Sequence, residues 1–260
     1  MKLGLIGARL GHSYSRIIHD IFHQLTGLES SYDLIEIPES RNLERRVREL
    51  MEEGYDGLNV TIPYKVDILQ MAGFVSEEAA GIGAANTILY ENGVIRAFNT
   101  DYFGFAKTLE ISGIDVKGNN FTILGSGGSS RSVSAVLEDM GADEIKIASR
   151  SRTGNGFVDY NHIGEGYGLV NTTPVGMFPE TDGCPLDDRA IAGFKVVIDI
   201  IYNPSRTLLL EKAERNGSIT ANGMMMLVAQ AVKAQEIWRS RTFSNELITE
   251  IYKRMEGYNV

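Results

Sequence analysis

The chain has 260 residues, of which 43% are hydrophobic and 23% are charged, and its formal net charge at pH 7 is −9. This composition is typical of a globular protein that buries a core, and the length suits one large domain or two of ordinary size. The negative charge argues against a general nucleic-acid binder, which needs a basic face to displace counterions. We therefore expect no nucleic-acid partner.

The single cysteine, Cys184, has no partner for an internal disulfide, and the sequence holds no Cys/His cluster of the kind that binds zinc. The apolar run at residues 1–7 is too short for a signal peptide, and the longest apolar stretch, Met224 to Ala229, is far below membrane-spanning length. We expect a cytoplasmic protein with no metal site and no membrane partner.

Short apolar runs typical of strands alternate with helical patterns in the first part of the chain. The expected elements are strands at Lys2–Ile6, Tyr32–Glu36 and Asp56–Val60, and helices at Ser15–Thr26 and Arg41–Glu53. Ser40 is a candidate N-cap of the second helix, and Gly54 is a candidate terminator. Such alternation favours an α/β domain with a mainly parallel sheet covered by helices.

The pattern indicates a second unit after Asp101. The elements expected from there to the end of the sequence are helices at Tyr102–Ser112, Ser129–Met140, Thr207–Arg215, Met224–Arg239 and Asn245–Met255, and strands at Asn120–Leu124, Glu144–Ser149, Gly168–Asn171 and Val196–Ile200. The stretch from Thr153 to Gly168 is rich in Gly and Asn and shows no regular pattern.

A glycine turn follows the strand at Asn120–Leu124 and precedes a helix, which is the context that gives such a turn meaning. Gly125 permits a tight turn, and Gly127 lets the backbone approach a pyrophosphate that the helix N-terminus would then bind. The third position of the G-x-G-x-x-G motif is Ser130, so the match is imperfect. The alternative is an ordinary tight connection between a strand and a helix.

The next strand ends in Ala148-Ser149-Arg150-Ser151-Arg152. An NAD-specific fold usually places an acidic residue here to bond the ribose hydroxyls. Two arginines and neighbouring hydroxyls suit a 2′-phosphate instead, which favours NADP(H) as the cofactor. The alternative is a solvated basic loop.

Three further segments carry dense polar side chains: residues 11–15, residues 59–65, and residues 83–87 together with 99–101. The first two follow strands directly, and parallel sheets bind ligands at the carboxyl ends of their strands. Hydroxyls and amides without metal ligands suit a polyol substrate better than an apolar one.

Lys65 and Asp101 are the candidate reacting groups. Hydride delivery to a ketone develops alkoxide charge, which a lysine ammonium can stabilise and protonate while a carboxylate holds it in place. Spacing alone does not pair the two residues. Lys65 could equally be an exposed residue at a helix start, and Asp101 an N-cap. His12, His19, His23 and His162 are the other proton-transfer candidates.

The ordered motifs resemble those of the shikimate dehydrogenases over nearly the whole chain. The segments that carry the resemblance are residues 12–15, 59–65, 83–87, 99–101, 125–128, 171–177, 199–204 and 223–230. The family's fold has two α/β domains: a substrate domain, expected here at 1–101 with 239–260, and a Rossmann-like NADP-binding domain, expected at 102–238. The family's reaction is the NADPH-dependent reduction of 3-dehydroshikimate to shikimate, on the route to chorismate and the aromatic amino acids.

The resemblance also implies a role for individual residues. Lys65 and Asp101 would be the catalytic pair. The substrate would be bound by Ser13, Ser15, Thr61, Asn86, Tyr202 and Gln230. The cofactor would be bound by Gly125, Ser126, Gly127, Gly128, Ser129, Ser149, Arg150, Arg152, Ile200 and Gly223. The protein would be a monomer or a homodimer that binds only these small molecules.

The chain departs from the family pattern at several positions. Arg16 and Asp20 stand where the family usually has Pro and Asn, and Ser149-Arg150-Ser151 replaces the usual Asn-Arg-Thr. The segment between Arg150 and Asn171 is too short for the helix and strand that the family places there, so we expect this part of the NADP-binding domain to be shortened.

Two other functions are compatible with the sequence. One is a quinate/shikimate dehydrogenase, or a paralogue acting on a related cyclic polyol acid. The other, of a different class, is a non-catalytic NADP-binding regulator on the same scaffold. Ser13, Ser15 and the missing acidic residue after the adenine-side strand favour shikimate with NADP(H), and the presence of Lys65 and Asp101 favours an enzyme.

Overall fold

The computed structural model describes residues 1–11, 13–150, 154, 157–256 and 258. The chain forms two compact units, the first from Met1–Gly104 with Val228–Val260 and the second from Phe105–Leu227. The expected domain ranges differ from these units mainly in helix α8 (Met224–Arg239), most of which belongs to the first unit. His12, Ser151 and Arg152 lie outside the described residues.

The first unit is built on a sheet with the strand order β2-β1-β3-β5-β6-β4. Its strands are β1 (Lys2–Gly7), β2 (Ser31–Glu36), β3 (Gly57–Val60), β4 (Phe74–Val75), β5 (Thr87–Glu91) and β6 (Val94–Phe98). Strand β1 is parallel to both β2 and β3, and β4 is parallel to β6, whereas β5 is antiparallel to both of its neighbours. The sheet therefore joins a parallel half to a hairpin.

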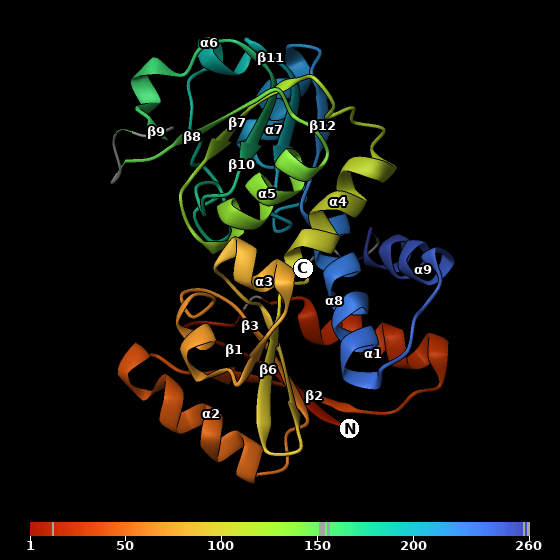
Figure 1. The fold of residues 1–260 in the computed structure, drawn as a ribbon. Coiled ribbons are helices and arrows are strands. Elements are labelled where there is room, and N and C mark those ends of the chain that lie inside the picture. Colours follow the sequence, from red (N-terminus) through yellow and green to blue (C-terminus); the bar gives the residue numbers. More distant parts are fainter. Residues whose placement is uncertain (12, 151–153, 155–156, 257, 259–260) are drawn as a thin grey trace. The chain divides into compact units, whose positions relative to one another are not determined.

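Helices cover both faces of this sheet. They are α1 (Ser15–Thr26), α2 (Leu43–Glu52), α3 (Glu77–Ile82), α9 (Asn245–Glu256) and the larger part of α8, with 3₁₀ turns η1 (Ser40–Asn42) and η2 (Asp67–Met71). Figure 1 shows α2 on one face, with α1 and α8 on the other. Alternate side chains of β1 point to opposite faces of the sheet. Ile6 packs in the core with α2, while Leu3 and Leu5 pack against Trp238 of α8.

Gly57 makes the contact between β3 and α8 possible. A Cβ atom at this position would overlap the indole ring of Trp238, whose Nε1 donates a hydrogen bond to the carbonyl of Ile88 at 2.9 Å. Because the strand carries no side chain here, the helix approaches the sheet closely enough for the indole to bond β5.

Two local predictions for this unit need correction. The helix expected at Arg41–Glu53 begins at Leu43, after a 3₁₀ turn, so Asn42 and not Ser40 precedes it. The hairpin of β5 and β6 was not predicted, although its two-residue turn, Asn92-Gly93, has the positive φ angles of 53° and 79° that this residue pair favours. The terminator Gly54 adopts φ 87° and bonds back to the Met51 carbonyl.

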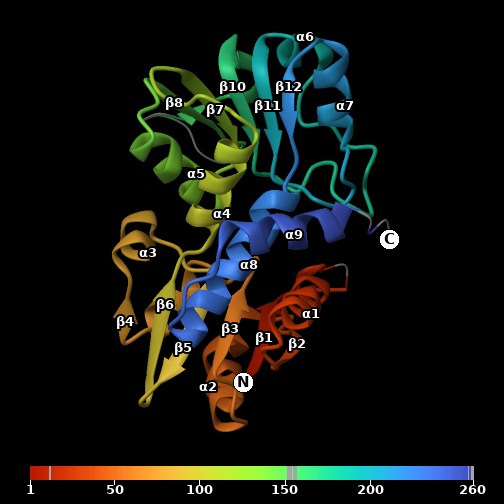
Figure 2. The same cartoon turned by 90° about the vertical axis from the view of Figure 1, so that its right-hand side faces the viewer.

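The second unit contains an all-parallel sheet with the strand order β12-β11-β10-β7-β8-β9. Figure 2 shows five of its strands side by side, in the order β8, β7, β10, β11 and β12. They are β7 (Asn120–Leu124), β8 (Glu144–Ala148), β9 (Phe157–Val158), β10 (Gly166–Asn171), β11 (Phe194–Asp199) and β12 (Ile219–Ala221). By order of appearance this is the 3-2-1-4-5-6 arrangement of dinucleotide-binding folds, with its switch point between β7 and β10.

The helices of the second unit differ in length, from four residues to twelve. They are α5 (Gly128–Asp139), α6 (Asp188–Ile191), α7 (Leu208–Arg215) and most of α4 (Asp101–Ile111), with a 3₁₀ turn, η3 (Tyr160–His162). Between β8 and β10, the described residues hold only β9 and η3, with no α-helix. This is the segment expected to be shortened.

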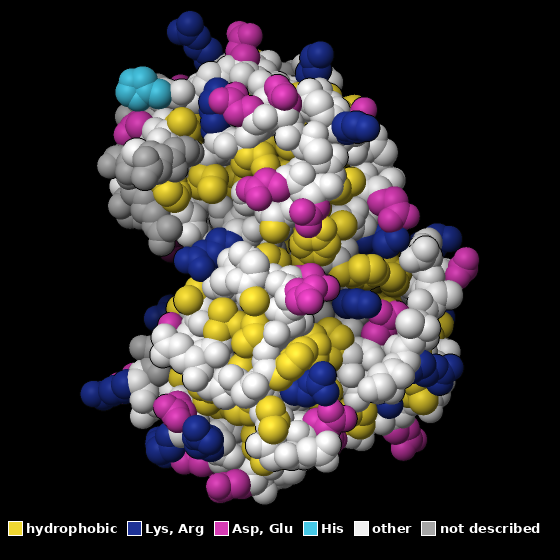
Figure 3. Space-filling view, in the orientation of Figure 1, with side chains coloured by type: hydrophobic (Ala, Val, Ile, Leu, Met, Phe, Trp, Pro, Cys, Tyr) yellow, Lys and Arg dark blue, Asp and Glu magenta, His cyan; other side chains and the backbone are white. Residues whose placement is uncertain are grey.

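Charged side chains of both signs are interspersed on the face that Figure 3 shows. In the part of the chain that the structure describes, no helix is both long and apolar enough to cross a membrane.

Candidate active site

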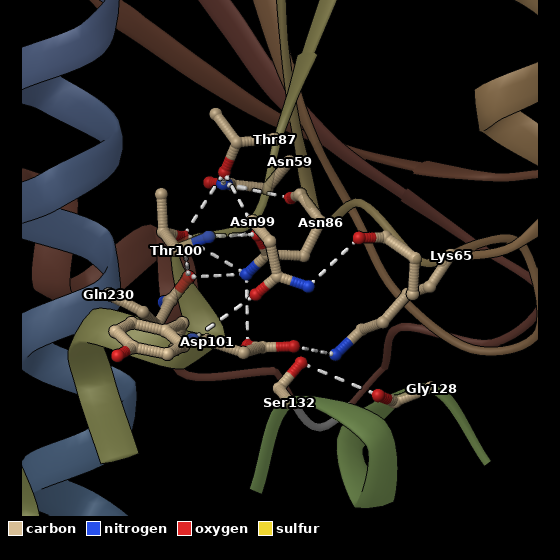
Figure 4. A network of polar contacts seen from close by, with 12 residues as sticks. Asn59, Lys65, Asn86, Thr87, Asn99, Thr100, Asp101, Gly128, Ser132 and Gln230 are labelled. Carbon is tan, nitrogen blue, oxygen red and sulfur yellow. Dashed lines mark hydrogen bonds and ion pairs between the residues drawn. The ribbon is translucent and has the colours of Figure 1, made fainter. Parts of the chain in front are cut away.

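Lys65 and Asp101 form a nearly buried ion pair in the first unit. Lys65 lies in the turn after β3, where its carbonyl accepts a hydrogen bond from Ala85 N at 2.7 Å, and Asp101 begins α4. The Lys65 Nζ atom is 2.6 Å from Asp101 Oδ2, and the two side chains are only 13% and 8% exposed (Figure 4). The structure thus brings together two residues that their spacing in the sequence did not pair and that only the family resemblance did.

Asn86 holds the second oxygen of Asp101. Its Nδ2 atom donates to Asp101 Oδ1 at 2.9 Å, while its Oδ1 atom accepts from the backbone N–H of Thr100 at 2.7 Å. A backbone N–H can only donate, so this bond fixes which way the amide points. Gln230 Oε1 completes the cluster at 3.4 Å from Asn86 Nδ2 and from Thr100 Oγ1 (Figure 4).

A further layer of polar side chains supports this cluster. Asn59, in the fully buried strand β3, donates from Nδ2 to Thr87 Oγ1 at 3.0 Å, and Tyr32 donates to Asn59 Oδ1 at 2.7 Å. Asn99 bonds the Ala84 carbonyl and accepts from Tyr102 N, so it, and not Asp101, caps the start of α4. The sequence assigns these residues no individual role. The signal for Asn59 is a polar residue within an otherwise apolar strand.

Ser13 lies in the connection between β1 and α1, and Ser15 is the first residue of α1. Their Oγ atoms are 3.1 Å apart, and the first turn of α1 contains no acidic residue. Thr61 follows β3, the strand next to β1, and its backbone N–H bonds the Ile6 carbonyl at 2.9 Å. These hydroxyls therefore lie at neighbouring strand ends, beside a helix N-terminus that favours an anion. Arg16 is exposed on α1.

The expected phosphate loop of the second unit has the geometry that a dinucleotide needs. Gly125 adopts φ 104°, and a Cβ atom there would come within 2.8 Å of Thr172 Oγ1. Gly127 directly precedes α5, where no side chain caps the helix, and the space beside its Cα is open. The backbone can therefore approach a pyrophosphate at the helix N-terminus.

The end of β8 suits a 2′-phosphate. Ser149 is buried, and its Oγ lies 3.2 Å from Ser126 Oγ, which links this strand end to the glycine loop. Arg150 is exposed directly after it, and the positions from Ala148 to Arg150 contain no carboxylate. The predicted ligand Arg152 lies outside the described residues. The residues present therefore fit NADP(H).

The buried carboxylate of Asp199 connects the ends of β10 and β11, beside the switch point. Asp199 accepts from Asn171 Nδ2 at 3.0 Å, from Ile201 N at 3.1 Å and from Thr207 Oγ1 at 2.7 Å, and burial raises its pKa to about 6. These bonds tie the end of β10 to the end of β11 and to the start of α7. The sequence gives Asp199 no role beyond membership of a motif.

Gly223 and Ile200, the residues expected beside the nicotinamide, meet at the end of β11. A Cβ atom on Gly223 would overlap the backbone carbonyl group of Ile200, so only glycine fits. Tyr202 is half-buried in the same unit. Among the described residues, no three His, Cys, Asp or Glu side chains gather as they would around a metal ion.

Comparison with known proteins identifies the family. A model of the shikimate dehydrogenase substrate binding domain matches residues 5–88. The shikimate dehydrogenase (NADP(+)) of Clostridium perfringens strain 13 is 39% identical over 270 aligned residues, which cover 98% of this chain and 99% of that protein. The chain belongs to the shikimate dehydrogenase family. The family that the ordered motifs indicated is thereby confirmed.

Solved structures of shikimate dehydrogenases extend the similarity to the fold. A chorismate mutase/shikimate 5-dehydrogenase fusion protein from Clostridium acetobutylicum is 36% identical, with a TM-score of 0.93 and coverage of 98% of this chain and 97% of that one. Shikimate 5-dehydrogenase from Thermus thermophilus, solved in complex with NADP(H) and shikimate, is 28% identical, with a TM-score of 0.86 and coverage of 98% and 99%. The predicted α/β fold, with a Rossmann-like unit, is confirmed.

Proposed function

We propose that this chain is an NADP-dependent shikimate dehydrogenase, which catalyses the reversible reduction of 3-dehydroshikimate to shikimate. The observation that carries the proposal is the ion pair of Lys65 and Asp101, held by Asn86 in a nearly buried polar cluster. Relatives and solved structures that match nearly the whole chain are named shikimate dehydrogenases, which supports the proposal.

Lys65 acts on the oxygen of the substrate. In the direction of reduction, its ammonium donates a hydrogen bond to the ketone oxygen, stabilises the alkoxide charge as it develops, and transfers a proton to give the hydroxyl. Asp101 keeps Nζ in place through Oδ2, while Asn86 holds Oδ1 so that the carboxylate cannot rotate. Preorganised charge of this kind is the main means by which such a site lowers the barrier.

The remaining polar residues of the site bind and orient the substrate. Ser13 and Ser15, at the N-terminus of α1, suit its carboxylate, with Tyr202 also assigned to that group. Thr61, Asn86 and Gln230 supply a hydroxyl and two amides for the ring hydroxyls.

NADPH, when bound, supplies the hydride. In our proposal, the backbone of Gly125 to Ser129 binds the pyrophosphate, Ser149, Arg150 and Arg152 bind the 2′-phosphate, and Ile200 and Gly223 flank the nicotinamide. We also propose a cytoplasmic location, in keeping with a single half-buried cysteine.

An assay of the purified protein separates this function from the two alternatives. Shikimate and quinate are each tested with NADP⁺ and with NAD⁺, and nucleotide reduction is followed by absorbance. We expect the highest kcat/KM with shikimate and NADP⁺. Turnover with quinate alone would support the quinate/shikimate dehydrogenase or related paralogue. No turnover with any of the four pairs would exclude the proposed enzyme activity and favour the non-catalytic NADP-binding regulator.

A further inference from the structure

Asp199, the last residue of β11, is a fully buried carboxylate whose hydrogen-bond donors are all neutral. They are Asn171 Nδ2 at 3.0 Å, Ile201 N at 3.1 Å and Thr207 Oγ1 at 2.7 Å. Among the described residues, no lysine or arginine pairs with it, and burial raises its pKa to about 6. At neutral pH the second unit therefore contains a buried negative charge that is hydrogen-bonded but not neutralised.

The hydrogen bonds of Asp199 do not require this charge. An asparagine in its place would have the same shape, and its Oδ1 atom would accept from Asn171 and Ile201. Its Nδ2 atom would donate to Thr207 Oγ1, because a hydroxyl can accept as well as donate. A buried charge without a cationic partner is costly, so the carboxylate calls for a reason other than these three bonds.

The order of the strands places Asp199 on the nicotinamide side of the proposed cofactor site. The glycine loop, which would bind the pyrophosphate, follows β7, and the residues that would bind the 2′-phosphate follow β8. On the other side of β7 lie β10 and then β11, about 5 Å and about 10 Å away. A dinucleotide with its adenosine over β8 must therefore extend its nicotinamide half over β10 and β11.

Asp199 is also bonded to the backbone expected to flank the nicotinamide. Its Oδ1 atom accepts from Ile201 N, and the Ile201 carbonyl accepts from Gly223 N at 3.0 Å. Ile200, the other expected neighbour of the ring, directly follows Asp199 in the chain. The carboxylate is thus two hydrogen bonds away from Gly223, in a buried region where charges are screened less than in water.

We propose that the buried charge of Asp199 makes the site favour the oxidised form of the cofactor. The nicotinamide ring of NADP⁺ carries a positive charge and that of NADPH does not, whereas the rest of the two molecules is the same. A fixed negative charge therefore attracts only the oxidised ring. At an effective dielectric constant of about 20, two unit charges about 12 Å apart change an affinity about tenfold.

The inference rests on the proposed function for the identity of the cofactor and for the side on which its nicotinamide lies. It also gives Asp199 a part in the reaction. In the direction of reduction, loss of the hydride leaves a positive charge on the ring, and Asp199 stabilises that charge as it develops.

The ratio of the Kd of NADPH to the Kd of NADP⁺ tests the inference without catalysis. Asp199→Asn removes the charge and keeps the shape, so we expect this ratio to fall about tenfold in calorimetric titrations at pH 8. Asp143→Asn, which removes an exposed charge before the start of β8, is the matched control and should leave the ratio unchanged.

Thermal unfolding verifies the fold of Asp199→Asn and measures the cost of the charge. Because the folded-state pKa of Asp199 lies above the ordinary value of 3.8, the folded protein binds the proton more tightly than the unfolded chain. The stabilisation from Asp199 is therefore fully present below pH 3.8 and is lost as the pH rises through about 6. We expect Asp199→Asn to gain in melting temperature relative to the wild-type protein between pH 4 and pH 8.

The wild-type protein should lose its preference for NADP⁺ as the pH falls through about 6, because protonation removes the charge of Asp199. We expect the ratio of Kd values to decline between pH 8 and pH 5.5 in the wild-type protein and to stay constant in Asp199→Asn. The 2′-phosphate titrates in the same range, but both nucleotides carry it, so it cancels from the ratio. Cys184 also interacts with Asp199, and its pKa is raised by burial, so the thiol stays neutral throughout.

Thr207→Val provides an independent test, because it keeps the charge of Asp199 and removes a hydrogen bond that lowers its pKa. The midpoint of the pH profile should move to higher pH, and Thr207→Ser, which keeps the hydroxyl, should restore it. These variants and the wild-type profile decide the matter even if Asp199→Asn does not fold.

A wild-type ratio of Kd values that does not change with pH, or a folded Asp199→Asn protein with the wild-type ratio, would overturn the inference. A protein that is inactive on shikimate but shows the expected shifts in the ratio would overturn only the proposed function. A protein that binds neither nucleotide would overturn both.

Discussion

Asp101 shows what single residues in a sequence do and do not disclose. As a residue at the start of a helix it could have been a cap, but its two oxygens are bonded to Lys65 and Asn86, and Asn99 caps α4. The partners Lys65 and Asp101 are 36 positions apart, and neither helical nor strand periodicity relates positions at that distance. Only the order of motifs shared with a family indicated the pair. The roles of all the predicted site residues, Lys65 and Asp101 included, stay predictions.

His19 is a residue for which the sequence suggests a reactive role that the structure does not support. The sequence marks it as a proton-transfer candidate, whereas the structure buries it as a neutral, bonded ring. Its burial could not be predicted, because it depends on Tyr32, Gln235 and Trp238, which come from distant elements.

The stability of the first unit should depend on pH through His19. The folded-state pKa of His19, about 3, lies below the ordinary value of 6.5, so the unfolded chain binds the proton more readily. This contribution to stability is fully present above pH 6.5 and is lost as the pH falls toward 3, by up to about 1.4 kcal/mol per pH unit. His23, whose pKa is also lowered by burial, adds a loss of the same sign.

Denaturant unfolding between pH 5 and 8, followed by the fluorescence of Trp238, measures this effect. Trp238 is the only tryptophan and its ring centroid lies 5.8 Å from that of His19. Below pH 6.5, the slope of the unfolding free energy against pH reports how many more protons the unfolded chain binds than the folded protein. His19→Gln should lower that number by about one, whatever its effect on absolute stability. Equal slopes in the two proteins would contradict the assignment.

At the scale of elements, the longer helices and most parallel strands were predictable, whereas the connections and several short elements, among them α3, α6 and β12, were not. The helices Ser15–Thr26 and Met224–Arg239 and the strand Asn120–Leu124 have the expected bounds, because their apolar patterns are long and uninterrupted. The hairpin of β5 and β6 was not predicted, although the pair Asn92-Gly93 is typical of its turn. The segment after β8 offered no pattern, and it holds only a two-residue strand and a 3₁₀ turn among its described residues.

Two glycines of the phosphate loop should respond differently to alanine. Gly125→Ala places a side chain at φ 104° and against Thr172, so it should lower the melting temperature and weaken NADPH binding. Gly127→Ala has φ −86° and open space, so it should fold normally and lose affinity for NADPH only. Calorimetric titration and thermal unfolding measure both. Unimpaired NADPH binding by Gly127→Ala would remove this loop from the cofactor site.

At the scale of the whole molecule, cofactor choice should appear as a difference in stability. A ligand that binds only the folded protein stabilises it by about 2.7 kcal/mol at a hundred times its Kd. NADPH should therefore raise the melting temperature more than NADH at equal concentration. Arg150→Gln should reduce that difference, because it removes a cation from the end of β8. An equal rise with both nucleotides in the wild-type protein would contradict a 2′-phosphate site there.

The central claim is that Lys65, held by Asp101, performs the proton transfer in shikimate oxidation and reduction. The most direct measurement is steady-state kinetics of shikimate and NADP⁺ turnover in the wild-type protein and in Lys65→Met, with thermal unfolding to verify the fold of the variant. We predict that kcat falls by about 10²–10⁴-fold while the KM for shikimate changes far less, as expected when a group acts mainly in the transition state. A folded Lys65→Met protein that retains wild-type kcat would contradict the account.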